Sequence, residues 1–126
     1  MVSHCATHGD QDVRITQRER GGVTILDLDG KLSISGGDVA FREALERLLS
    51  SGETMILVNL RSLRSMDSSG LGEIIAAKAA AAASGATIKL LHVEDKVRQV
   101  ISLTHLIGVF ETFDDEIDAI ASFSQT

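Results

Sequence analysis

The fold is decided by the stretch Met66-Asp67-Ser68-Ser69-Gly70-Leu71-Gly72 and by the segments on either side of it. An apolar strand that ends near Leu60 precedes this stretch, and an alanine-rich helix that ends at Ser84-Gly85 follows it. A helix that begins here leaves its first backbone N–H groups without intrahelical partners, and such a terminus carries about half a positive charge. A serine at this place can cap the helix, bind a phosphate or accept one, and the residues alone leave all three open.

The segments before this stretch predict a β-hairpin and then a helix. Residues 13–18 alternate as in a half-buried strand, Gly21-Gly22 is typical of a hairpin turn, and residues 23–28 form the returning strand, which Gly30 is expected to end. Residues 39–49 carry an apolar stripe at helical spacing. The strand over residues 53–60 is almost continuously apolar, which is typical of a central strand covered on both sides.

The segments after the stretch continue the alternation of helix and strand. We expect a strand over residues 87–93, a short helix over 94–103, an edge strand over 109–113 and a last helix over 114–123. In the last helix the residues expected to be buried are Ile117, Ile120 and Ala121. Alternating elements imply parallel strands with right-handed crossovers. The predicted fold is therefore α/β, a single mixed β-sheet with about four helices packed against it.

Length and charge limit the classes of partner. A chain of 126 residues is long enough for one domain with a real core. Its formal net charge of −6 argues against DNA or an anionic membrane as a main partner, because both require a basic surface. No apolar run is long enough to span a membrane, and the single Cys5 cannot form an internal disulfide, so a reducing cytoplasm fits best.

The first residues of the chain are polar and aperiodic, so we expect residues 1–11 to be a disordered tail and residues 12–126 to form the domain. His4, Cys5 and His8 are potential metal ligands, but they lack a fourth partner, so no metal site is predicted.

Familiar catalytic signatures are absent from the sequence. There is no Gly-x-x-x-x-Gly-Lys-Ser/Thr phosphate loop, no Gly-x-Ser-x-Gly nucleophile elbow and no Gly-x-Gly-x-x-Gly after the first strand. His92 and His105 stand alone and are better interpreted as structural or surface residues than as general bases. We therefore predict no catalytic residue, no cofactor and no enzymatic activity.

Two features around the decisive stretch have both a structural and a functional interpretation. A cap by Asp67 or Ser68 is sufficient for a helix start, but Gly70 and Gly72 each cost up to about 1 kcal/mol relative to alanine. Small residues there suggest that something approaches the backbone closely. The alanines between residues 76 and 83 are explained by high helix propensity, or by a slim helix surface on which another surface packs.

The chain resembles the STAS domain, and specifically the stand-alone anti-anti-sigma factors of bacteria. The resemblance rests on the stretch 66–72 after a strand that ends near Leu60 and covers roughly residues 12–123. Supporting matches are Asp29-Gly30-Lys31-Leu32 and Gly85-Ala86-Thr87-Ile88-Lys89-Leu90.

The resemblance implies partner switching by a protein that is not an enzyme. In that family the plain protein binds an anti-sigma factor that is also a serine kinase, and this frees the sigma factor. The kinase phosphorylates the serine that matches Ser68, and a serine phosphatase reverses the modification.

The same resemblance implies a partner-binding surface around the phosphorylated serine. Residues matching Asp67, Ser69, Gly70 and Leu71 flank that serine on the surface that the kinase grips. Ser33 stands where many relatives carry an acidic residue near the nucleotide of the kinase, which would retune recognition or weaken the kinase reaction.

Two other functions remain open on the sequence. One is a constitutive STAS binding module, such as a scaffold or transporter-associated subunit, in which Ser68 only caps the helix. The other is a small nucleotide-binding or phosphate-handling enzyme that uses the same helix terminus. ATP-dependent phosphorylation by a cognate kinase would separate the antagonist from the module, and nucleotide turnover would indicate the enzyme.

Removal of residues 1–11 should leave the fold intact, since this segment has no apolar periodicity. A chain that starts at Asp12 should melt within a few degrees of the full-length chain in a thermal unfolding experiment followed by circular dichroism. A loss of cooperative unfolding would show that the tail packs against the domain.

Overall fold

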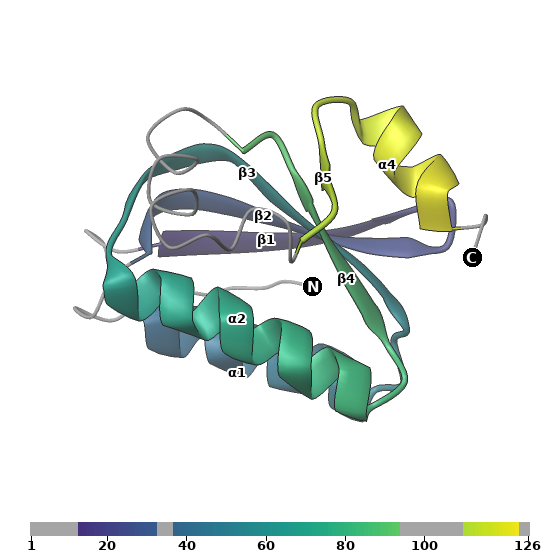
Figure 1. Ribbon diagram of the computed structural model, residues 1–126, viewed down its shortest axis with the longest axis horizontal. Coiled ribbons are helices and arrows are strands. Elements are labelled where there is room, and N and C mark those ends of the chain that lie inside the picture. Colours follow the sequence, from purple (N-terminus) through teal and green to yellow (C-terminus); the bar gives the residue numbers. More distant parts are fainter. Residues whose placement is uncertain (1–12, 33–36, 94–109, 124–126) are drawn as a thin grey trace.

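The computed structural model describes residues 13–32, 37–93 and 110–123 (Figure 1). Their strands form one sheet in the order β1-β2-β3-β4-β5. The strands are β1 (Val13–Arg20), β2 (Val23–Leu32), β3 (Met55–Met66), β4 (Thr87–Leu91) and β5 (Thr112–Phe113). β1 pairs with β2 in antiparallel fashion, and every later pair is parallel. The predicted mixed sheet is thereby confirmed.

The described residues contain the helices α1 (Gly37–Ser50), α2 (Ser68–Ala83) and α4 (Glu116–Phe123). The expected helix over residues 94–103 lies outside the described residues, as do the tail 1–11 and its potential metal ligands. α1 and α2 lie side by side on one face of the sheet, and α4 lies on the other face (Figure 1). The sheet is therefore covered on both sides, but α4 covers only part of its face.

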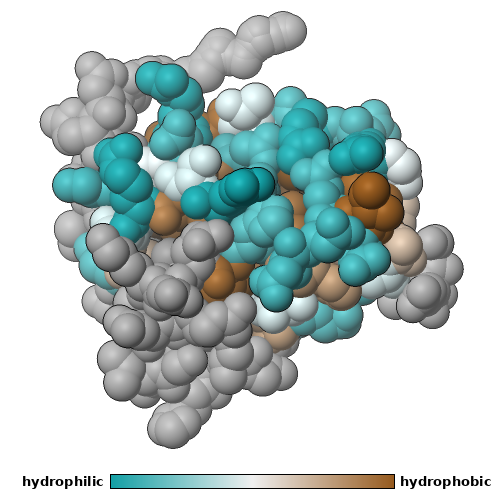
Figure 2. All heavy atoms as spheres, turned by 90° about the horizontal axis from the view of Figure 1, so that it is seen from above, coloured by the Kyte–Doolittle hydropathy of each residue, from teal (hydrophilic) through white to brown (hydrophobic). Residues whose placement is uncertain are grey.

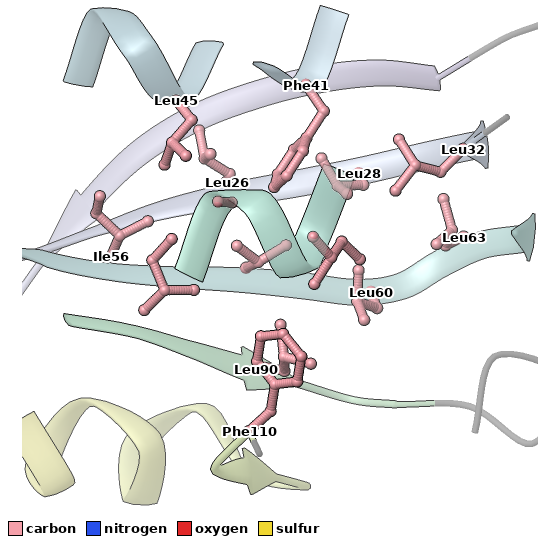
Figure 3. Packing of buried hydrophobic residues seen from close by; sticks show 14 of the residues in the cluster. Leu26, Leu28, Leu32, Phe41, Leu45, Ile56, Leu60, Leu63, Leu90 and Phe110 are labelled. Atoms are coloured by element: carbon pink, nitrogen blue, oxygen red, sulfur yellow. The ribbon is translucent and has the colours of Figure 1, made fainter. Parts of the chain in front are cut away.

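The larger core lies between the sheet and the pair α1 and α2. Phe41 and Leu45 of α1 point toward Leu26 and Leu28 of β2 in this core (Figure 3). A smaller core lies under α4 and includes Ile25, Leu57 and Phe123, among others. Because successive strand residues face opposite sides of a sheet, Ile56 and Val58 fall in the larger core and Leu57 in the smaller one. This confirms that β3 is a central strand buried on both faces.

Two strands are longer than the sequence pattern predicts. β2 continues through Gly30, which has a positive φ of 120°, and ends at Leu32. β3 continues beyond Leu60 to Met66. Its register with β2 shifts between Asp27 and Asp29 and again between Gly30 and Lys31. Such bulges interrupt the alternation of buried and exposed residues, so the end of β3 does not look like a strand in the sequence.

The predicted core of the last helix is wrong for Ile117 and Ala121, whereas Ile120 packs against the smaller core. Ile117 is 62% exposed, Ala121 is exposed and Ile120 is only partly buried, whereas Ala119 and Phe123 are the buried residues of α4. The helix starts at Glu116, whose side chain pairs with Arg18 and Arg20 of β1. Glu116, Ala119 and Phe123 lie on one face at helical spacing, so this face packs toward the sheet.

Polar contacts attach α4 to the sheet. Arg18 of β1 donates to both Asp27 of β2 and Glu116 of α4 at 2.6 Å, and Arg20 donates to Glu116 at 2.6 Å. The hydrogen bond from Arg18 is the main cause that lowers the pKa of Glu116 from 4.5 to about 2, with a further contribution from Arg20. The same bonds, first from Glu116 and then from Asp27, raise the pKa of Arg18.

A buried lysine adds a second attachment. Lys89 of β4 is 1% exposed, and its Nζ donates to Ser122 Oγ at 2.9 Å and lies 4.6 Å from the centre of the Phe123 ring. Its charge is also 3.3 Å from the Glu111 carboxylate. A buried ammonium group is tolerated only when it is paired in this way, so Lys89 holds α4 to β4.

Substitution Glu116→Gln should destabilise the protein in a pH-dependent way. A carboxyl whose pKa is lower in the folded chain stabilises the fold above its unfolded value of 4.5, and that stabilisation is lost as the pH falls toward 2. At pH 7 we expect a loss of roughly 1–3 kcal/mol in the free energy of unfolding, typical of charged hydrogen bonds. Urea unfolding at several pH values measures it.

The matched control is Glu46→Gln on the exposed surface of α1, which should change stability by less than about 0.5 kcal/mol. A wild-type advantage over Glu116→Gln that stays constant from pH 7 to pH 3 would contradict the role given to the Glu116 charge.

Candidate functional site

The candidate site is the turn that joins β3 to α2. Asp67 is the N-cap of α2, with extended backbone angles of −100° and −173°, and its side chain accepts a hydrogen bond from the Gly70 N–H at 3.0 Å. Ser68 is the first residue of the helix. The first turn of α2 contains no acidic residue. The sequence left open whether Asp67 or Ser68 caps the helix. The structure shows that Asp67 is the cap.

The turn is fixed against the end of β2. The Asp67 N–H donates to the carbonyl oxygen of Leu32 at 3.3 Å. Gly70 is buried and packs directly against the same carbonyl group. A Cβ added at this position would lie 2.2 Å from the Leu32 oxygen. No side chain other than hydrogen fits there, so the glycine is required by a contact inside the molecule. The close approach that the sequence predicted at Gly70 is made by β2.

Gly72 differs from Gly70. It is exposed, and a Cβ added to it would meet nothing within 4 Å. Packing within the described residues therefore gives no reason for a glycine at position 72. Its missing side chain leaves the backbone of the first turns of α2 open at the surface.

The other predicted partner-binding residues lie at different depths. Leu71 is 4% exposed and belongs to the larger core, while Ser69 is half-buried and Asp67 is exposed. Leu71 and Gly70 thus pack beneath the turn, on its buried side. Asp67 and Ser69 contribute to the surface of the turn. Ser33 lies outside the described residues.

One face of the alanine tract is buried in the core, and the other face is exposed. Ala77 and Ala81 are buried in the larger core, whereas Ala76, Ala79 and Ala80 are exposed. The exposed alanines extend the open surface that begins at Gly72 along α2. One face of the tract therefore packs in the core, and packing by another surface on the exposed face stays a prediction.

The described residues show few features of other functional classes. No group of His, Cys, Asp or Glu among them is arranged to hold a metal ion. His92 follows β4 with a positive φ of 57°, and its N–H donates to the Phe113 carbonyl at 2.7 Å, which fits a structural role. None of the described helices is long and apolar enough to cross a membrane.

Sequence reasoning missed the partner of the turn and the charges beside it. Leu32 was not predicted to contact the turn, because β2 was expected to end at Gly30. Lys31, Arg61 and Arg64 were not singled out, because the end of β3 was not recognised as a strand. The spacing of buried Leu60, Leu63 and Met66 every three residues was the available signal.

Comparison with known proteins places these features in a family. The sequence profile described as "Mlab, STAS domain" matches residues 15–111. The anti-sigma F factor antagonist of Paenibacillus polymyxa is 25% identical over 109 residues, which are 86% of this chain and 93% of that protein.

Solved structures agree with the profile. The crystal structure of a putative anti-sigma factor antagonist from Thermotoga maritima superposes with a TM-score of 0.79 at 26% identity, over 86% of this chain and 92% of that chain. The Bacillus cell fate determinant SpoIIAA, solved in its phosphorylated form, gives a TM-score of 0.68 at 22% identity over 86% of this chain and 98% of that chain. At that identity the second likeness shows the fold alone.

Substitution of the two glycines should separate the internal contact from the open surface. Gly70→Ala should lower the free energy of unfolding by about 2 kcal/mol or more, because its methyl group must displace the Leu32 carbonyl. Gly72→Ala has free space and should leave stability unchanged or raise it by up to about 1 kcal/mol. Urea unfolding of both variants provides the comparison. Equal effects would mean that α2 does not rest on Leu32 in solution.

Proposed function

The chain belongs to the family of STAS domains, and we propose that it is an anti-sigma factor antagonist switched by phosphorylation of Ser68. In its plain form it binds an anti-sigma factor with serine kinase activity and thereby releases a sigma factor. The kinase transfers phosphate to Ser68, and a serine phosphatase removes it. The relatives named as anti-sigma factor antagonists support this role.

One observation carries the assignment of the switch to Ser68. Asp67 already caps α2, since its carboxylate accepts from the Gly70 N–H at 3.0 Å. A serine at position 68 is therefore not needed as the N-cap, although the sequence alone allowed that explanation. Ser68 is the first residue of α2, and the exposed Gly72 leaves the surface of the same helix start without a side chain, which suits position 68 to modification by an enzyme that grips the helix start.

The fold should tolerate a phosphate at this position. A phosphoserine carries about −1.5 to −2 charges at pH 7. The N-terminus of α2 favours a negative charge by roughly 0.3–1 kcal/mol. The Asp67 carboxylate next to it opposes the phosphate by a comparable amount at a surface dielectric. Because the two contributions nearly cancel, phosphorylation should leave the stability of the domain almost unchanged.

Binding should be far more sensitive than folding. When a partner covers Ser68, a phosphate there loses water and faces polar groups that were not arranged for it. Such an unpaired charge commonly costs about 2–5 kcal/mol at an interface. At 1.4 kcal/mol per factor of ten, affinity should fall roughly thirty-fold to several-thousand-fold.

In this proposal the chain performs no chemistry of its own. The kinase and the phosphatase supply the catalytic groups, and the chain supplies the hydroxyl and the surface around it. It needs no cofactor, metal or nucleic acid, and it works in the bacterial cytoplasm, where sigma factors and their regulators meet.

The Ser68 variants test the switch. The anti-sigma factor kinases of the organism that encodes this chain would be purified and each titrated by calorimetry against the wild type, Ser68→Ala and Ser68→Glu. We expect Ser68→Ala to bind like the wild type and to resist phosphorylation, and Ser68→Glu to bind at least tenfold more weakly with an unchanged melting temperature. Mass spectrometry after incubation with ATP should place the phosphate on residue 68 rather than on Ser69.

The control is Ser50→Glu at the end of α1, which adds the same charge away from the turn and should bind normally. Full phosphorylation of Ser68→Ala would refute the site. Equal affinity of the plain and phosphorylated chains would favour a constitutive STAS module in place of a switch.

A further inference from the structure

The sheet face that carries α4 has two halves that differ in how their charges are paired. In the half beneath α4, the cations Arg18, Arg20 and Lys89 all have carboxylate partners. The Asn59 amide also donates to Asp27 at 2.8 Å in this region. Charge in this half is therefore satisfied inside the molecule.

The other half lies beyond Asp27 and Asn59, toward the N-terminus of α2. Here β2 and β3 continue after their first register shift, while the pairing of β3 with β4 ends at Asn59. Leu60, Leu63 and Met66 are buried in the larger core, so the residues between them are exposed in consecutive pairs. These pairs are Arg61 with Ser62 and Arg64 with Ser65. The bulges thus place two arginines at the surface of one short segment.

Lys31 joins these arginines from the neighbouring strand. It is exposed and lies in register with Ser65, the residue after Arg64. Within the described residues, the side chains of Lys31, Arg61 and Arg64 make no ion pair and no hydrogen bond; only the backbone N–H of Arg61 donates to Asn59 Oδ1, at 3.1 Å. These three residues are called the cationic edge here. Seen from above the view of Figure 1, hydrophilic residues cover much of the surface that is not drawn in grey (Figure 2).

Among the residues that the structure describes, carboxylates do not fully balance the cationic edge. Asp29 is the acidic residue of this part of β2, and it lies opposite Arg14 of β1 in the antiparallel register. Asp29 is also in register with Ser62 of β3, the residue after Arg61. Among the described residues, Arg14, Lys31, Arg61 and Arg64 thus face the carboxylates of Asp29 and the exposed Asp67, and positive charge remains in excess. The chain as a whole has a formal net charge of −6. An unpaired positive cluster on an acidic protein is a local feature that the fold itself does not need.

The cationic edge adjoins the turn described above. Lys31 precedes Leu32, whose carbonyl oxygen accepts from the Asp67 N–H at 3.3 Å. Arg64 lies two residues before Met66, the end of β3. A partner that covers the start of α2 therefore meets this edge as it docks, and the positive end of the helix dipole adds to the same field.

We propose that the cationic edge steers an acidic segment of the anti-sigma factor onto the turn, an inference that rests on the function proposed above. Clustered charges of one sign raise association rates by roughly 10- to 1,000-fold, and salt weakens this effect. A protein segment fits better than DNA or a membrane, because the overall charge of −6 repels an extended polyanion. Three cations match a short acidic stretch.

Charge reversal at the edge tests the proposal. Stopped-flow association would be measured between the chain and the anti-sigma factor kinase that binds the wild type in the titrations above. Arg64→Glu should slow association several-fold, and the triple variant Lys31→Glu, Arg61→Glu, Arg64→Glu should slow it tenfold or more, with a nearly unchanged dissociation rate. The wild-type rate should fall steeply between 20 and 300 mM salt, and the triple-variant rate should not.

Arg47→Glu on the exposed surface of α1 is the matched control, since it makes the same change of charge elsewhere, and it should associate at the wild-type rate. A thermal melt of each variant checks folding, and the milder triple substitution to glutamine serves where the glutamate variant is unstable.

The outcomes separate this inference from the proposed function. If the wild type binds a kinase and the triple variant associates at the same rate and with the same salt dependence, the steering role is wrong while the antagonist function stands. If the wild type binds none of the kinases, both are overturned. Wild-type binding to a DNA duplex or to phosphatidylglycerol vesicles that the triple variant loses, with kinase association unchanged, would assign the edge to a different polyanion.

Discussion

The contact between the Leu32 carbonyl and Gly70 is the constraint on which the candidate site depends. It joins the end of β2 to the first turn of α2, and the Asp67 N–H at 3.3 Å ties the cap to the same oxygen. With no room for a Cβ, the helix cannot shift along the strand without losing this fit. A helix start held in this way presents its surface residues in one arrangement, and pre-organised surfaces bind without the cost of ordering a loop.

The two-sided sheet isolates this site from the rest of the molecule. α2 rests on the larger core, while α4 is only 8 residues long and sits on the opposite face. A helix of that length is not stable alone, so its attachment depends on Phe123 in the smaller core and on the ion pairs of Glu116. Those charges lie away from the turn, and a change of charge at residue 68 leaves their pairing in place. The groups that attach α4 to the sheet are therefore separate from those that form the turn.

The sequence predicted the elements well and the details of their ends poorly. Alternation over residues 13–18 and the apolar run of β3 identified the first strand of the hairpin and the central strand, because one-sided and two-sided burial leave different patterns. The extension of β3 to Met66 was missed, because bulges replace alternation with buried residues at every third position. The prediction of which α4 residues are buried was wrong for Ile117 and Ala121. The ion pairs of α4 with Arg18 and Arg20 link residues far apart in sequence, so the local sequence pattern does not reveal them. In the site, the sequence predicted that another group approaches the backbone closely at Gly70. It could not show that this group is the Leu32 carbonyl of β2.

The two proposals act in the same direction on the switch. The plain chain offers a partner the positive terminus of α2 and the unpaired cations Lys31, Arg61 and Arg64. A phosphate on Ser68 would bring about −1.5 to −2 charges to the same end of the molecule and offset at least half of the charge of those three cations. It would then weaken binding twice, once by placing an uncompensated charge in the interface and once by reducing the field that attracts an acidic segment. The first effect raises the dissociation rate and the second lowers the association rate, so a modest local change of charge produces a large change in affinity without any rearrangement of the fold.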